Sequence, residues 1–212
     1  MLQQNFLSLL SNYTPNVHLM NELWTAIETP YTDKKRYYHS LQHLESLFVE
    51  LIAIQNRIEQ WEVVLFSLYY HDVVYEPLRS DNEEKSAIFS EQHLQQLHVP
   101  TLQIERIKQQ IIATKSHAAN ADMDTNYFTD ADLSILGQNW ATYSIYLQHI
   151  RKEYAILPDF IYNRGRKKVL EHFLAMPRIY KTDYFFRRLE QQARHNLQQE
   201  VMLLNKWDGT WT

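Results

Sequence analysis

The segment from Trp61 to Val73 constrains the fold more than any other part of the sequence. The helix that it predicts is apolar on several faces, with Val63, Val64, Leu65, Phe66 and Leu68. Such a helix has to be buried among other elements. The polar pair His71-Asp72 stands at its end, and Pro77 follows as a helix breaker. Burying an imidazole and a carboxylate there is costly unless they are paired or bound to a metal ion.

Most of the remaining sequence also has a helical period. Further helices are predicted over residues of roughly 17–28, 36–57, 83–97, 101–116, 140–157, 161–176 and 183–205. Three glycines and six prolines are few for a β-rich protein, and no segment predicts a strand. We therefore expect an all-α fold, a single helical bundle domain over residues 1–212, with a core of roughly 36–137 and C-terminal helices of roughly 140–205.

Composition excludes several classes of protein. The chain has no cysteine, so thiolate metal sites and disulfides are excluded, whereas ten histidines are present. The formal net charge of −4 argues against a nucleic-acid partner. A basic run over residues 164–168 is interpreted as a solvated helix face rather than a phosphate or nucleic-acid patch. No apolar run approaches the ~18 residues of a membrane span. The N-terminus lacks the basic segment of a signal peptide, and we expect a cytoplasmic protein.

Four side chains along the chain have the chemistry of a metal site. They are two imidazoles and two carboxylates, which suit a hard or borderline divalent cation: His43, His71, Asp72 and Asp132. His39 lies four residues before His43, so both are expected on one face in the first turns of the helix over 36–57. Side chains of adjacent helical residues diverge by about 100°, so the pair at 71 and 72 can face one ion only where the helix ends.

Each of these features has a structural alternative. Two histidines at i and i+4 often lie on a solvated face, and a His-Asp dipeptide is common by chance. Asp130 and Asp132 are expected to open a short helix that Gly137 ends, and Asp at a helix start is often a cap. A zinc-protease HExxH site is excluded, because Ser-Leu-Gln occupies residues 40–42. The joint order of the features favours a metal site.

That order, H…HD…D, resembles the HD superfamily of metal-dependent phosphohydrolases. More closely, the runs RYYHSLQH, YYHDVVYEP, NEEKSA, TKSH and TDADLSILG resemble a bacterial family of predicted metal-dependent HD phosphohydrolases, over residues of roughly 35–205. The resemblance implies an HD-type bundle that hydrolyses a mono- or diester of a small phosphorylated molecule, such as a nucleotide. It implies one or two divalent ions (Mn, Mg, Fe, Co or Zn) held by His43, His71, Asp72 and Asp132, with Asp130 as a supporting or capping residue.

The resemblance also suggests catalytic and substrate-binding residues. His39, Asp72 and Lys115 are the expected catalytic residues. His39 matches a general acid of cyclic-nucleotide phosphodiesterases, although Ser40 replaces their usual Asn; its alternative role is to orient a ligand. Three residues are expected to bind substrate: Arg36, Lys115 and His117. His117 could instead bind a second metal or be an ordinary loop residue, and the two cations could be solvated.

Two other functions are compatible with these motifs. One is an iron oxygenase on the same helical scaffold, which would need additional histidine ligands. The other is a metal-binding module without hydrolytic activity, in which the ion contributes to stability. The sequence leaves the identity and number of metal ions, the substrate and the oligomeric state open.

Overall fold

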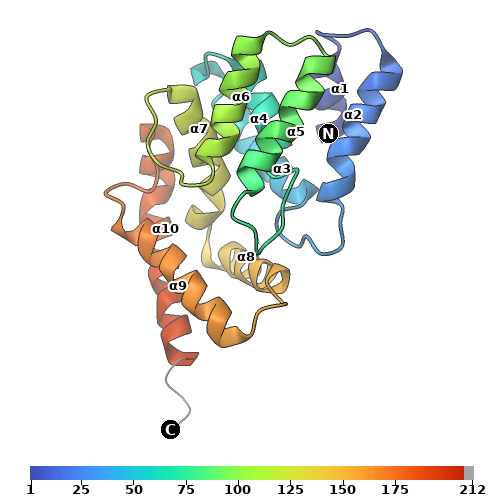
Figure 1. The fold of residues 1–212 in the computed structure, drawn as a ribbon. Helices are drawn as coiled ribbons and strands as arrows, with labels where there is room; N and C mark the ends of the chain where they lie inside the picture. Colours follow the sequence, from blue (N-terminus) through green and yellow to red (C-terminus); the bar gives the residue numbers. More distant parts are fainter. Residues whose placement is uncertain (208–212) are drawn as a thin grey trace. The chain divides into compact units, whose positions relative to one another are not determined.

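The computed structural model describes residues 1–207, and in this part of the chain every regular element is helical (Figure 1). The all-α prediction is therefore confirmed. The density of internal contacts divides the chain into two compact units, Met1–Thr129 and the residues from Asp130 onward. The predicted single domain of HD type over 1–212 stays a prediction, and its last five residues lie outside the described residues.

The first unit is built around α4. Its helices are α1 (Leu2–Leu10), α2 (Val17–Tyr31), α3 (Leu41–Ile52), α4 (Trp61–Tyr70), α5 (Asn82–Gln96), α6 (Thr101–Ala113) and most of α7 (Met123–Asp132), with a 3-10 turn at Gln55–Arg57. Every residue of α4 from Val63 to Tyr70 is buried, and α4 packs against α3, α5 and α6. The predicted central helix is thus confirmed, because an element that is apolar all round finds partners on several sides.

The second unit is built around α10. It contains the end of α7, a 3-10 turn η2 (Leu133–Gly137), α8 (Trp140–Glu153), α9 (Asp159–Ala175) and α10 (Asp183–Trp207). Both η2 and α9 pack against α10. The buried Asn196 amide of α10 donates hydrogen bonds to the carbonyls of Leu136 and Gln138, 2.8 and 2.7 Å away. These bonds fix the end of η2, where Gly137 was predicted to end a helix.

Two predicted helix starts are wrong. Helix α3 begins at Leu41 rather than Arg36, after Ser40 in an extended conformation with φ −120° and ψ 179°. His39 therefore lies before the helix, not in its first turn. Helix α7 begins at Met123, so Asp130 and Asp132 stand at its end and do not open a helix.

The early start of α7 has a local cause. The Asp122 carboxylate accepts hydrogen bonds from the backbone N–H groups of Asp124 and Thr125, at 3.3 and 3.2 Å, and from the Thr125 hydroxyl at 2.6 Å. This is the bonding of an N-cap residue, which satisfies N–H groups that lack helical partners. Asp is a residue type favoured at the N-cap, so Asp122 is the local sequence signal for this start.

The basic run of α9 is only partly solvated. Arg166 has a side chain that is 9% exposed, and its guanidinium donates to the buried Glu200 carboxylate at 2.7 and 3.0 Å. The Tyr143 hydroxyl donates to the same carboxylate. The predicted solvated face is therefore wrong for Arg166, because its partner lies 34 residues away in the sequence.

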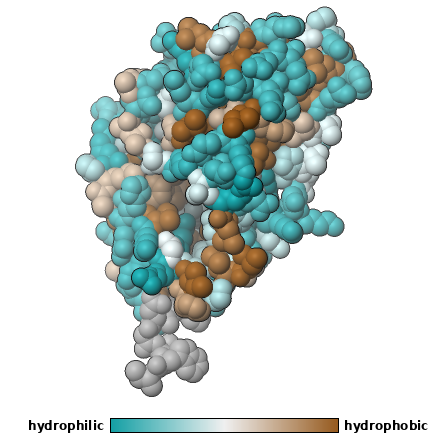
Figure 2. All heavy atoms as spheres, in the orientation of Figure 1, coloured by the Kyte–Doolittle hydropathy of each residue, from teal (hydrophilic) through white to brown (hydrophobic). Residues whose placement is uncertain are grey.

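Apolar side chains also gather at the surface of the second unit. The exposed ones on α8, α9 and their connection are Ile145, Ile156, Phe160, Ile161 and Val169. Figure 2 shows apolar spheres over α8 and α9 on the face that it draws. In the described part of the chain, no helix combines the length and apolarity that crossing a bilayer requires.

Gly137 provides a test of the packing between η2 and α10. A Cβ atom at this position would lie 2.5 Å from Leu189 Cβ and 2.9 Å from the Leu189 carbonyl oxygen. We predict that Gly137→Ala lowers the free energy of unfolding by about 1–3 kcal/mol, because the backbone must move apart. The matched control is Gly165→Ala in α9, where nothing lies within 4 Å of the added carbon. That change should stabilise by about 0.5–1 kcal/mol. Urea denaturation measures both, and equal effects would contradict the packing argument.

Candidate metal centre

His71 stands at the end of α4 with its ring orientation fixed. Its backbone remains helical, with φ −59° and ψ −39°, and its side chain is 1% exposed. The ring Nδ1 lies 2.9 Å from the carbonyl oxygen of Leu68. A carbonyl only accepts hydrogen bonds, so Nδ1 carries the hydrogen and a neutral ring presents its lone pair at Nε2. A backbone carbonyl commonly orients a metal-binding histidine in this way.

His43 and Asp72 converge on that nitrogen. The two Nε2 atoms of His43 and His71 are 3.2 Å apart. Asp72 Oδ2 lies 3.0 Å from His71 Nε2 and 3.9 Å from His43 Nε2. The adjacent residues 71 and 72 can thus face one point, as expected where α4 ends. Their exposed fractions, 1% and 17%, make Asp72 the more accessible ligand.

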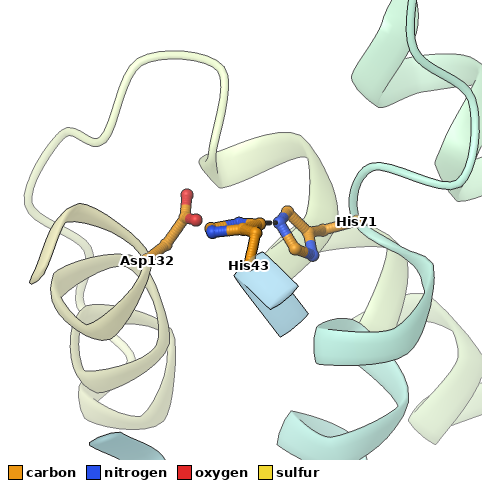
Figure 3. A group of neighbouring side chains, drawn as sticks. All are labelled: His43, His71 and Asp132. Atoms are coloured by element: carbon orange, nitrogen blue, oxygen red, sulfur yellow. Dashed lines mark hydrogen bonds between the residues drawn. The ribbon is translucent and has the colours of Figure 1, made fainter. Parts of the chain in front are cut away.

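Asp132 completes the group. His43, His71 and Asp132 each offer a ligand atom, and these atoms all lie within 4.8 Å of one another. Figure 3 shows the Asp132 carboxylate directed toward the His43 ring, with His71 on the other side.

The place of Asp132 is set by α7. Near its start, the Asp124 carboxylate accepts hydrogen bonds from the N–H groups of Glu59 and Gln60, just before α4, at 2.9 and 2.7 Å. One turn later, the Phe128 ring meets the His71 ring edge-on with centroids 5.8 Å apart. Asp132 follows four residues after Phe128, on the same helix face. Helix α7, which packs against His71 through Phe128, therefore also carries Asp132.

The donor set fits a divalent cation. The Asp72 carboxylate and the His43 ring approach His71 Nε2, and Asp132 lies within 4.8 Å of both histidines. Because His71 Nε2 accepts, a proton on His43 Nε2 or a bound cation has to lie between the two rings. Nitrogen and carboxylate oxygen ligands suit Mn, Fe, Co and Zn, and less so Mg, which prefers oxygen alone. A possible metal site at His43, His71 and Asp132 thus agrees with the predicted metal cofactor, whose identity stays open.

Side chains of α2 and α5 hold the turn that follows α4. The Tyr31 hydroxyl accepts from the Asp72 N–H at 3.1 Å. The buried Ser86 hydroxyl bonds to both the N–H and the carbonyl of Val74, at 3.1 and 3.2 Å. The Asn82 amide does the same for Glu76, at 3.1 and 2.9 Å. None of these contacts was predicted from the sequence. A tyrosine and two polar residues inside helices gave no local signal, because their partners are 6 to 41 residues away.

His39 lies beside the metal group rather than in it. Its ring stacks on Tyr75 with centroids 4.0 Å apart and an interplanar angle of 28°. The centroids of the His39 and His43 rings are 6.0 Å apart. The position is compatible with either predicted role, as proton donor or as orienting residue, and both stay predictions.

The predicted substrate contacts at the end of α6 have structural partners. Lys115 Nζ donates to the Ser80 carbonyl at 2.6 Å and to the Glu84 carboxylate. The hydrogen bond to Glu84 raises the pKa of Lys115, which keeps the ammonium charged. His117 adopts a positive φ of 51°, and its N–H bonds to the Ala113 carbonyl at 3.0 Å. This left-handed residue closes the turn that follows α6, which ends at Ala113. Substrate-binding roles for Lys115 and His117 stay predictions.

Asp130 is buried and used by a different element. Its carboxylate accepts from the N–H groups of Lys181 and Thr182 at 2.9 and 2.7 Å, and from the Thr182 hydroxyl at 2.7 Å. The Lys181 ammonium lies 2.8 Å from the same carboxylate. Burial lowers the pKa of Lys181, and Asp130 opposes that shift. Asp130 thus anchors the start of α10, whereas Asp132 lies within 4.8 Å of the two histidines.

Comparisons of the chain with protein-family models, with curated proteins and with solved structures found no match. The resemblance to HD phosphohydrolases therefore rests on the sequence motifs alone. The approach of Asp72 to the two histidines, and that of Asp132, are separate observations made from geometry.

Substitution of the two aspartates should separate metal binding from stability. We predict that Asp132→Ala loses Co²⁺ binding but changes the free energy of unfolding in EDTA by less than about 1 kcal/mol, as for most partly exposed sites. Asp130→Ala should lower that free energy by about 3–5 kcal/mol, because it leaves the Lys181 charge buried without its partner. Calorimetric Co²⁺ titration and urea denaturation give the two quantities. The interpretation fails if Asp132→Ala still binds Co²⁺ as tightly as the unaltered protein.

Proposed function

We propose that this protein is a metal-dependent phosphohydrolase that acts on a small phosphate ester, such as a nucleotide. The observation that carries the proposal is the approach of His43 Nε2 and Asp72 Oδ2 to His71 Nε2, at 3.2 and 3.0 Å. His43, His71, Asp72 and Asp132 would hold the ion. A bound divalent ion lowers the pKa of a coordinated water and neutralises charge on a phosphoryl oxygen.

The chain's own residues supply the remaining chemistry of the proposal. The Asp72 side chain is 17% exposed, so it is suited to orient the attacking water. His39 is held by its stacking on Tyr75 and is the proposed proton donor to the leaving oxygen. Lys115 and His117 are the proposed phosphate contacts. The ammonium of Lys115 is paired with Glu84. It would attract a substrate phosphate as a point charge.

A metal-binding module without hydrolysis is the second candidate. It is favoured by the burial of the two histidines, 6% for His43 and 1% for His71. A closed, buried site is typical of ions that stabilise a fold, whereas catalysis needs an open coordination position. In this case removal of the ion would lower the melting temperature, and no substrate would be turned over.

Metal binding is the first test. We predict that the protein binds Co²⁺ or Mn²⁺ in isothermal titration calorimetry, and that His71→Ala and Asp72→Ala each weaken binding by more than the ~10–100-fold that loss of a supporting residue costs. Asp81→Ala is the matched control, because Asp81 is an exposed carboxylate paired with Arg79 on the following loop. Absence of binding by the unaltered protein would overturn the metal centre.

Phosphate release is the second test. The metal-loaded protein should release phosphate from at least one member of a panel of nucleotides, sugar phosphates and phosphodiesters, and Asp72→Ala should release none. Turnover that persists in Asp72→Ala would contradict the proposed mechanism. A bound ion without turnover would favour the binding module, and a visible absorption band with bound iron would favour the oxygenase alternative.

A further inference from the structure

Arg36 binds the backbone of the metal-ligand turn, not a free surface. Its Nη1 donates to the carbonyl of Asp72 at 2.7 Å, and its Nη2 donates to the carbonyl of Val73 at 2.9 Å. Both nitrogens at the end of the guanidinium are thus engaged with consecutive peptide groups. The sequence had suggested that this fork would bind a substrate phosphate.

Two tyrosine rings hold the guanidinium in place. Its central carbon lies 5.2 Å from the Tyr31 ring centroid and 5.6 Å from the Tyr75 ring centroid, within the range of cation–π contacts. The same Tyr31 accepts the Asp72 N–H through its hydroxyl. The N–H and the carbonyl of Asp72 are therefore both bound by this group of side chains, which we call the Arg36 clamp: Tyr31, Arg36 and Tyr75.

The clamp acts just after the end of α4. The carbonyls of Asp72 and Val73 follow the C-cap residue His71 and need donors from outside the helix, and the helix dipole places negative potential at this end. A guanidinium supplies a positive charge and two parallel N–H donors in a rigid plane, which matches two successive carbonyls. The ammonium of a lysine is a point charge and could not bind both carbonyls while stacking on the rings.

We propose that Arg36 is a positioning residue of the metal centre, and this proposal rests on the proposed metal binding at His71 and Asp72. Side chains at adjacent helical positions diverge by about 100°. The 3.0 Å approach of His71 Nε2 and Asp72 Oδ2 occurs just after α4 has ended at Tyr70, where the Asp72 N–H donates to the Tyr31 hydroxyl. By fixing the carbonyls of Asp72 and Val73, the clamp holds the backbone in the conformation that directs the Asp72 carboxylate at the histidines.

Substitution of Arg36 should weaken Co²⁺ binding, and added guanidinium should restore it. Arg36→Ala should raise the dissociation constant for Co²⁺ by about 10–100-fold, as expected for loss of a residue that orients ligands. Co²⁺ binding by Arg36→Lys should be weakened to a similar extent, because the charge of lysine does not replace the two parallel N–H donors of arginine. Guanidinium chloride at a millimolar, non-denaturing concentration should restore tighter Co²⁺ binding to Arg36→Ala, because the two rings and two carbonyls remain. Methylammonium chloride at the same concentration should not.

The matched control is Arg79→Ala. Arg79 also lies close after α4, but it pairs with the exposed Asp81 carboxylate at 2.9 Å. The Co²⁺ affinity and absorption spectrum of the Arg79→Ala protein should therefore be unchanged. Calorimetry gives the affinities, the visible bands of bound Co²⁺ report the ligand geometry, and circular dichroism reports the fold. If Arg36→Ala does not fold, the affinity and spectrum of folded Arg36→Lys decide the question.

The outcomes separate this inference from the proposed function. Failure of the unaltered protein to bind Co²⁺ would overturn the metal centre and the inference with it. Co²⁺ binding by the unaltered protein together with unchanged affinity and spectrum in a folded Arg36 variant would overturn the inference alone. So would unchanged Co²⁺ affinity with a raised KM for a hydrolysed phosphate ester, which would return Arg36 to substrate binding. Weakened Co²⁺ binding that guanidinium restores would support the clamp.

Discussion

Burial of α4 is the constraint on which the candidate site depends. Its residues from Val63 to Tyr70 are all buried, and the imidazole at its end is 1% exposed. An imidazole in such a place has to find partners for both ring nitrogens. The Leu68 carbonyl satisfies Nδ1, which leaves Nε2 facing His43 and Asp72. The same burial that stabilises the first unit therefore directs His71 Nε2 toward His43 and Asp72.

The turn after α4 gives this alignment its rigidity. Its peptide groups are bonded by side chains of Tyr31, Arg36, Ser86 and Asn82, which come from α2, from the segment before α3 and from α5. Such supporting residues orient metal ligands and tune affinity, although they do not touch the ion. The backbone of Asp72 is in this way fixed, while its carboxylate stays accessible.

The second unit has a polar interior of its own. Asp130 joins the end of α7 to the start of α10, and the buried pair of Arg166 and Glu200 joins α9 to α10. Buried pairs of this kind contribute little net stability but are costly to break singly. At the end of α7, Asp130 is the structural carboxylate and Asp132 is the carboxylate within ligand distance of the histidines. Two acidic residues that look equivalent in the sequence thus have different partners.

The sequence by itself determined the all-α class, the central position of α4 and the four candidate ligands. These follow from hydrophobic periodicity and from polar residues placed in apolar surroundings, which are local properties. Only the tertiary structure decided what Arg36, Asn82, Ser86 and Arg166 bind, because their partners are distant in the sequence and meet only after folding. The starts of α3 and α7 were also missed. The Asp122 side chain caps α7, and α3 begins only after the extended backbone of Ser40.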